Sequence, residues 1–148
     1  MSKKANFSNI YKFYDLINSV ITLGFDKTWR NKASKHIYGK RVLDLGSGTG
    51  AAFSVLSNYE VIAIDPDEKM LELNEFSNKI IGNSENLPFP DNSFDSVYCA
   101  FVWRNLNNPI KGLEEVHRVL RPGGKFILLD MTRPKTVSYT HLRAHETK

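Results

Sequence analysis

The residues best suited to chemistry form one short segment, Asp44-Leu45-Gly46-Ser47-Gly48-Thr49-Gly50. Alternating glycines remove side chains where a backbone must bend sharply and approach a ligand. A helix is predicted to follow, and its free N–H groups would point at that ligand. The segment also fits the dinucleotide fingerprint G-x-G-x-x-G/A, so alone it indicates a nucleotide-like ligand without saying which. The alternative is a tight turn that binds nothing.

A carboxylate, Asp65, supplies a second candidate at the end of the next predicted strand, about 20 residues after the glycine turn. A carboxylate at this position can accept hydrogen bonds from both hydroxyls of a ribose. NAD and S-adenosylmethionine both carry such a ribose, so Asp65 does not distinguish between them. The alternative roles are helix capping and solvation at the surface.

Short strands and helices that alternate along the chain must position these residues. Apolar runs such as 61–64 are typical of strands that are covered on both faces. The alternation predicts an α/β fold, a Rossmann-like, doubly wound and largely parallel sheet. Residues 7–37 show helical periodicity and predict N-terminal helices, with a break at Gly24. The predicted strands are 41–45, 60–64, 79–81, 94–101 and 125–130, and the predicted helices between them are 51–56, 68–75 (capped by Asp67) and 109–120.

Further segments carry a resemblance to a known family. The loop 82–95 and the Pro-Gly-Gly turn at 122–124 resemble those of class I methyltransferases. More narrowly, the segment that begins at Tyr14-Asp15 and the segment 100–105, Ala-Phe-Val-Trp-Arg-Asn, are similar to signatures of the ubiquinone and menaquinone biosynthesis C-methyltransferases. The similarity spans residues 7–134. It departs from the family pattern at Ile17, Asp26 and Val102, where the family usually has methionine, histidine and glycine.

The resemblance implies S-adenosyl-L-methionine as the cofactor and no metal. The glycine turn would line its methionine end, Asp65 would hold the ribose, and Asn83 would meet the adenine. Asp95 is predicted to be a structural turn residue instead, and Cys99 a buried strand residue. The implied cofactor-binding residues are Asp44, Gly46, Ser47, Gly48, Asp65, Pro66, Met70, Asn83, Ser84 and Ala100.

The resemblance also implies that Tyr14, Arg104 and Asn105 face the methyl acceptor, a quinol precursor that is methylated on a ring carbon. An arginine is a poor base because its pKa exceeds about 12, so stabilising a phenolate is the expected role of Arg104. The other interpretations are a core position for Tyr14 and a loop-fixing role for Arg104 and Asn105. The alternative functions are methylation of another small molecule, an inactive cofactor-binding fragment, and an NAD-dependent oxidoreductase.

We expect three segments: a helical substrate-side cap at 1–38, the cofactor-binding core at 39–134, and a tail at 135–148. The tail shows no periodicity and resembles translated sequencing-adapter read-through, so we interpret it as non-native. The family-like sequence stops near Pro134, which predicts a truncated sheet without its last two strands. Such a sheet would be marginally stable.

The composition of the chain limits the classes of partner that it could bind. The net charge is +4, but the lysines and arginines are dispersed, which disfavours a nucleic-acid partner. The single cysteine excludes an internal disulfide, and no apolar run approaches the roughly 18 residues needed to span a bilayer. We therefore expect a cytoplasmic protein. The resemblance implies that its partner is a small-molecule acceptor. A lipid quinol would add peripheral contact with the inner membrane face.

Overall fold

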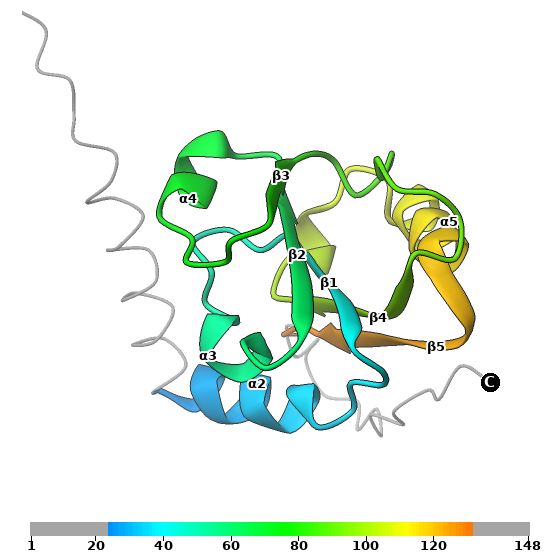
Figure 1. Cartoon of the computed structure of the whole chain (residues 1–148). Helices are drawn as coiled ribbons and strands as arrows, with labels where there is room; N and C mark the ends of the chain where they lie inside the picture. The colour runs from blue at the N-terminus through cyan, green and yellow to red at the C-terminus, as the bar shows by residue number, and fades with distance from the viewer. Residues whose placement is uncertain (1–23, 132–148) are drawn as a thin grey trace, which may run out of the picture.

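The computed structural model describes residues 24–131, which form a five-stranded sheet with helices on both faces (Figure 1). All pairings between neighbouring strands are parallel, and the order across the sheet is β3-β2-β1-β4-β5. This order confirms the predicted Rossmann-like class. The strands are β1 (Arg41–Leu45), β2 (Glu60–Asp65), β3 (Lys79–Ile81), β4 (Phe94–Ala100) and β5 (Leu120–Leu129).

The helices begin where the sequence supplies start signals. Gly24, where a break was predicted, adopts φ 77° just before the first described helix. The carboxylate of Asp67 accepts hydrogen bonds from the backbone N–H groups of Lys69 and Met70, so it caps the next helix as predicted. The predicted helical residues 7–23 lie outside the described part of the chain. The helices are α2 (Phe25–Ser34), α3 (Phe53–Leu56), α4 (Glu68–Glu72) and α5 (Pro109–Val119), with a 3₁₀ turn η1 (Trp103–Asn105).

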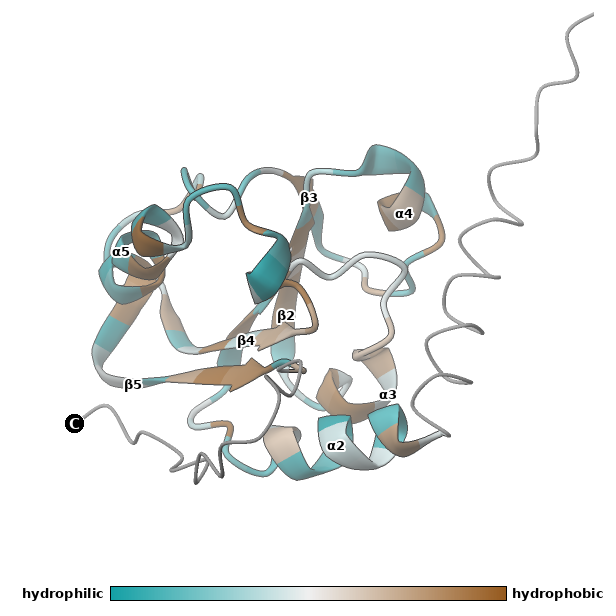
Figure 2. Ribbon diagram, turned by 180° about the vertical axis from the view of Figure 1, so that it is seen from behind, coloured by the Kyte–Doolittle hydropathy of each residue, from teal (hydrophilic) through white to brown (hydrophobic). Residues whose placement is uncertain are grey.

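The sheet separates two hydrophobic cores, because successive side chains of a strand point to opposite faces. On one face, Val42 and Tyr98 pack with α2 and α3. On the other, Leu43 and Cys99 pack with α5. Figure 2 shows hydrophobic stretches along β2 and β5. Cys99 is fully buried, as predicted.

The start of β5 differs from the prediction of a strand at 125–130. Leu120 already pairs with Phe94, and pairing resumes at Lys125 with Ser96, so residues 121–124 form an irregularity inside the strand. Pro122 cannot continue a helix, and Gly123 adopts φ 78°, which lets the chain bulge and rejoin the sheet. The strand therefore begins five residues earlier than its apolar core suggests.

Asp95 secures this corner, in keeping with its predicted structural role. Its Oδ2 accepts hydrogen bonds from the backbone N–H groups of Lys40 and Arg41, both at 3.0 Å. Its Oδ1 accepts one from Arg121 Nη1 at 2.8 Å. These bonds hold the pKa of Asp95 below its usual range, with burial opposing them. The carboxylate thus ties the start of β1 to the bulge of β5.

Arg118 of α5 holds the long loop between β3 and β4. Its Nη1 donates to the carbonyl of Phe89 at 2.7 Å, and its Nη2 donates to that of Leu87 at 3.0 Å. Glu115 pairs with the same guanidinium and accepts a hydrogen bond from the backbone N–H of Leu87 at 2.7 Å. The loop that follows β3 is therefore fastened to a helix on the α5 face of the sheet.

Candidate functional site

A pocket of about 470 Å³ opens at the carboxyl ends of the strands, where open parallel sheets bind ligands. Loops after β1, β2, β3 and β4 line it, together with α2. The structure brings every predicted site residue except Tyr14 to this pocket, and Tyr14 lies outside the described residues. The predicted residues in its wall are Asp44, Gly46, Ser47, Gly48, Asp65, Pro66, Met70, Asn83, Ser84, Ala100, Arg104 and Asn105.

The three glycines of the turn have different reasons to lack a side chain. Gly46, Gly48 and Gly50 all have positive φ, at 70°, 55° and 85°. A Cβ on Gly46 would lie 2.6 Å from the methyl groups of Val102, and one on Gly50 would lie 2.9 Å from Asn74. A Cβ on Gly48 would meet nothing closer than 3.8 Å, at Met70. Gly46 and Gly50 are therefore required by their neighbours, whereas Gly48 leaves room at the pocket wall.

A buried hydrogen-bond chain supports the turn. Asn74 Nδ2 donates to Ser47 Oγ at 2.8 Å and to the carbonyl of Gly48 at 3.0 Å, and Ser47 Oγ donates to Asp44 Oδ2 at 2.6 Å. Burial raises the pKa of Asp44 to about 6, although the Ser47 hydrogen bond and the charge of Arg30 oppose the rise. Sequence analysis missed Asn74, because its role depends on a contact with residues 26 and 27 positions away.

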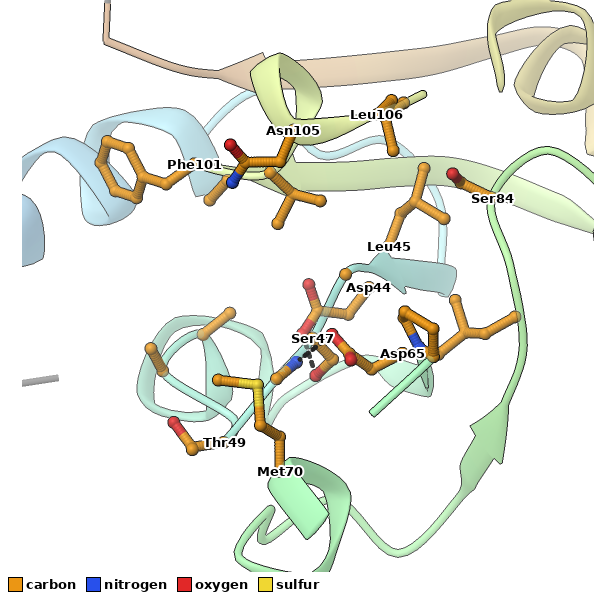
Figure 3. A pocket seen from close by; sticks show the side chains of 18 of the residues that line it. Asp44, Leu45, Ser47, Thr49, Asp65, Met70, Ser84, Phe101, Asn105 and Leu106 are labelled. Carbon is orange, nitrogen blue, oxygen red and sulfur yellow. Dashed lines mark hydrogen bonds between the residues drawn. The ribbon is translucent and has the colours of Figure 1, made fainter. Parts of the chain in front are cut away.

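Asp65 lies at the end of β2 with both carboxylate oxygens engaged by the backbone. Its Oδ2 accepts from Gly48 N–H at 2.9 Å and its Oδ1 from Asp67 N–H at 2.8 Å. Burial raises the pKa of Asp65, and these two hydrogen bonds oppose it. Each carboxylate oxygen has a second lone pair, so the group can accept further hydrogen bonds from a ligand. Figure 3 shows Asp65 beside Asp44 and Ser47, with dashed hydrogen bonds between the drawn groups.

The loop after β3 brings Asn83 and Ser84 to the same pocket. Asn83 Oδ1 accepts a hydrogen bond from the backbone N–H of Glu85 at 2.8 Å. Glu85 in turn accepts one from the backbone N–H of Asn108 at 2.7 Å, which links the loop to the start of α5. Two polar side chains are thereby held at the edge of the pocket that adjoins β3.

Arg104 and Asn105 come from the η1 turn after β4. The backbone N–H of Arg104 donates to Asp130 Oδ2 at 3.0 Å, and its Nε lies 3.8 Å from Asp130 Oδ1. The backbone hydrogen bond ties the loop to Asp130, and the same residue lines the pocket, so the geometry fits both the loop-fixing and the pocket-facing interpretations. In Figure 3, Asn105 lies across the pocket from Thr49 and Met70.

The pocket wall also contains residues that sequence analysis did not select as site residues, among them Arg30, Thr49, Phe101 and Met131. Thr49 was detectable, because it is a hydroxyl residue between two glycines of the turn. Phe101 lies in the family-like segment 100–105, but its φ of 61° is a property of the folded chain that the sequence does not indicate. Its ring lies 4.9 Å from the guanidinium carbon of Arg30.

The sheet order, the glycine turn and the two strand-end carboxylates define a class I methyltransferase fold. Solved structures agree. A SAM-dependent methyltransferase from Thermotoga maritima, described as a possible histamine N-methyltransferase, has a TM-score of 0.67 at 28% identity and matches 82% of this chain and 57% of its own. The YcgJ protein from Bacillus subtilis has a TM-score of 0.60 at 33% identity over 68% of this chain and 47% of its own.

Within this class, the chain belongs to the ubiE/COQ5 methyltransferase family, whose model matches residues 2–145. A demethylmenaquinone methyltransferase from Thermotoga maritima is 34% identical over 90% of this chain and 63% of its own length. A ubiquinone/menaquinone biosynthesis C-methyltransferase UbiE from Geobacter sp. (strain M21) is 37% identical over 88% of this chain and 63% of its own. The chain therefore spans less than two thirds of these relatives.

Proposed function

We propose that this chain binds S-adenosyl-L-methionine and methylates a ring carbon of a quinol precursor of menaquinone or ubiquinone. The observation that carries the proposal is the joint placement of Asp44, Gly48 and Asp65 in one pocket at the carboxyl ends of β1 and β2. Membership of the ubiE/COQ5 family supports the reaction class, and the activities for which the relatives are named support a quinol acceptor.

The residues of the pocket fit the cofactor. Gly48 leaves a cradle that a Cβ would enter between Met70 and Asp65, at 3.8 and 4.0 Å. Asp65, oriented by two backbone N–H groups, would accept the ribose hydroxyls. Pro66 and Met70 offer apolar contact to a purine, and Asn83 offers an amide that can bond its edge. A dinucleotide is disfavoured by the family of the chain, although the glycine turn alone would admit it.

When bound, the cofactor supplies a sulfonium methyl group, which is a strong electrophile. The protein then has to hold the acceptor and favour its phenolate form, because the negative charge activates the neighbouring ring carbon. Arg104 would stabilise that phenolate, and Asp130 would keep its guanidinium in place. Asn105, on the same turn, would orient the acceptor hydroxyl. Positioning of this kind can lower the activation free energy by on the order of 7 kcal/mol.

A lipid quinol acceptor would bring the chain to a membrane surface. Among residues 24–131, no helix combines the length and apolar character that crossing a membrane requires. The net charge of +4 supports contact with anionic head groups. We therefore propose that the protein acts as a peripheral enzyme at the inner face of the membrane.

Methyl transfer tests the proposal directly. The 148-residue chain, S-adenosylmethionine with a labelled methyl group, and a short-chain demethylmenaquinol are incubated, and label in the quinol is measured. The proposal predicts label on the ring carbon. Cofactor binding without any transfer would instead support the second candidate, a cofactor-binding unit that is inactive alone, which the partial coverage of the relatives favours.

A further inference from the structure

The described part of the chain has a positive and a negative end. Six lysines and arginines fall between residues 24 and 41, a segment whose single carboxylate is Asp26. By contrast, residues 65–75, which include α4, carry five carboxylates and one lysine. In both views α2 lies at the bottom and α4 at the top (Figure 1, Figure 2), so the two charged segments are well separated in space. The positive end is therefore the end at α2.

The outer side of α2 and its C-terminal cap present three lysines to solvent. Lys27, Lys32 and Lys35 are exposed, and none of them forms an ion pair with a carboxylate of residues 24–131. The inner side of the same segment packs against the core through Ala33 and Ile37. The three cations are thus carried on a helix that is anchored to the sheet, which suits them to an anionic partner.

Two aromatic rings adjoin these lysines. Phe25 and Trp29 are one helical turn apart and stack, with ring centroids separated by 6.1 Å and planes inclined by 19°. Phe25 is 52% exposed. Positions 25, 29 and 32 follow four- and three-residue spacing, so the rings and Lys32 share one side of the helix. Aromatic rings beside lysines are typical of helices at membrane interfaces, where rings enter the head-group region and ammonium groups meet anionic lipids.

The same helix forms part of the pocket wall. Asp26 and Arg30 of α2 line the pocket, so the lysine side of α2 lies only the width of one helix, about 10 Å, from it. The apolar tail of a lipid quinol stays in the bilayer while its ring reacts. The bilayer must then lie beside the pocket, and α2 is an element that borders the pocket and carries exposed cations and rings.

We propose that the outer side of α2 docks on a bilayer with anionic head groups and holds the pocket beside it. The lysines would attract the lipid phosphates, and the acidic end at α4 would face water. A nucleic acid would also attract the lysines, but it would give α2 no reason to border the pocket. This inference rests on the proposed function, because the lipid acceptor requires the membrane. The docking surface consists of Phe25, Lys27, Trp29, Lys32 and Lys35.

Sedimentation with vesicles tests this surface. The 148-residue chain is mixed with vesicles of phosphatidylcholine alone or of phosphatidylcholine with phosphatidylglycerol. It should bind only the anionic vesicles, and high salt should release it. The double variant Lys32→Gln/Lys35→Gln should bind them about tenfold to thirtyfold more weakly. The matched control Lys111→Gln/Lys125→Gln removes two exposed charges from α5 and β5, and it should lose less than about threefold.

Two further measurements complete the test. Tryptophan emission should shift to the blue on anionic vesicles, and Trp29→Phe should abolish the shift. Both double variants should bind S-adenosylhomocysteine as tightly as wild type, which shows that they are folded.

Three results would overturn the docking surface: no binding to anionic vesicles, equal losses in the two double variants, or tighter binding to a DNA duplex than to the vesicles. A wild-type chain that bound the vesicles but not S-adenosylhomocysteine would leave the surface standing and refute the proposed function.

Discussion

At the residue scale, the site depends on two carboxylates that folding removes from water. Asp44 and Asp65 are 3% and 8% exposed, and burial raises the pKa of each. Their positions were predictable, because both lie at the carboxyl ends of apolar strands, and these ends converge at one edge of a parallel sheet. Asn74 and Arg30 were not, because neither belongs to a local pattern and each acts through contacts that are remote in sequence.

The pKa of Asp44 predicts opposite pH effects on stability and on binding. Its pKa in the folded chain, about 6, lies above the ordinary value of 3.8, so the folded chain holds this proton more tightly than the unfolded chain. The stability contributed by Asp44 is therefore complete below about pH 4 and is lost as the pH rises through about 6. An ionised Asp44 would attract the ammonium of a bound S-adenosylhomocysteine, so the affinity for this ligand should fall as the pH drops below about 6.

Titrations between about pH 5 and about pH 8 measure this effect, with Asp44→Asn as the control. The variant should bind weakly and lose most of the pH dependence, leaving the smaller contribution of Asp65. A wild-type affinity that is constant over the whole range would contradict the prediction.

Arg104 gives a prediction about rate. Arg104→Ala should lower the methyl-transfer rate by about a hundredfold, because it removes the group proposed to stabilise the phenolate. The affinity for S-adenosylhomocysteine should stay unchanged. Arg104→Lys keeps the charge without the planar fork and should give an intermediate rate. Single-turnover assays and calorimetry together separate the two effects, and a full rate in the alanine variant would refute the assigned role.

At the scale of elements, the sequence predicted all five strands, because each is a short apolar run bounded by turn residues. It placed the start of β5 at residue 125 instead of Leu120, since the Arg-Pro-Gly-Gly segment looks like a break between elements. It also missed η1, whose three residues carry no periodic signal. The attachment of the 82–93 loop to α5 could not be predicted either, because it depends on hydrogen bonds from Arg118 to carbonyl groups about 30 residues away.

A substitution of Arg118 tests whether α5 holds the loop between β3 and β4. Arg118→Ala should lower the free energy of unfolding by about 2 to 3 kcal/mol, since it removes the guanidinium that pairs with Glu115 and donates to two backbone carbonyl groups. The loosened loop should also weaken S-adenosylhomocysteine binding, because it carries Asn83 and Ser84. Urea denaturation and hydrogen exchange over residues 82–93 measure the two effects. Lys111→Ala, an exposed change on the same helix, should produce neither.

At the scale of the molecule, the described sheet ends in β5, and the chain spans less than two thirds of its relatives. Leu128 of this edge strand is 45% exposed. An exposed apolar edge strand favours association with other chains, so we expect marginal stability and aggregation of the isolated chain. A cooperative, reversible thermal transition well above about 60 °C would be inconsistent with that expectation.

A substitution in β5 tests whether its exposed edge causes aggregation. Leu128→Lys should reduce aggregation, followed by light scattering at rising protein concentration, because a lysine at an edge opposes pairing with another strand. It should leave S-adenosylhomocysteine affinity unchanged, since Leu128 is not part of the pocket wall. Tyr38→Lys is the matched control, because Tyr38 is 53% exposed but belongs to the segment before β1 and not to the edge strand. Equal scattering by wild type and Leu128→Lys would count against the edge as the cause.

Calorimetric titration of the chain with S-adenosylhomocysteine and, separately, with NAD tests the central claim most directly. The wild-type chain should bind the first and not the second. Asp65→Ala should weaken binding by about tenfold to a hundredfold, because it removes a charged acceptor, and the exposed substitution Glu72→Ala should have no effect. Binding of NAD in place of S-adenosylhomocysteine, or an Asp65→Ala variant that binds as tightly as wild type, would contradict the account.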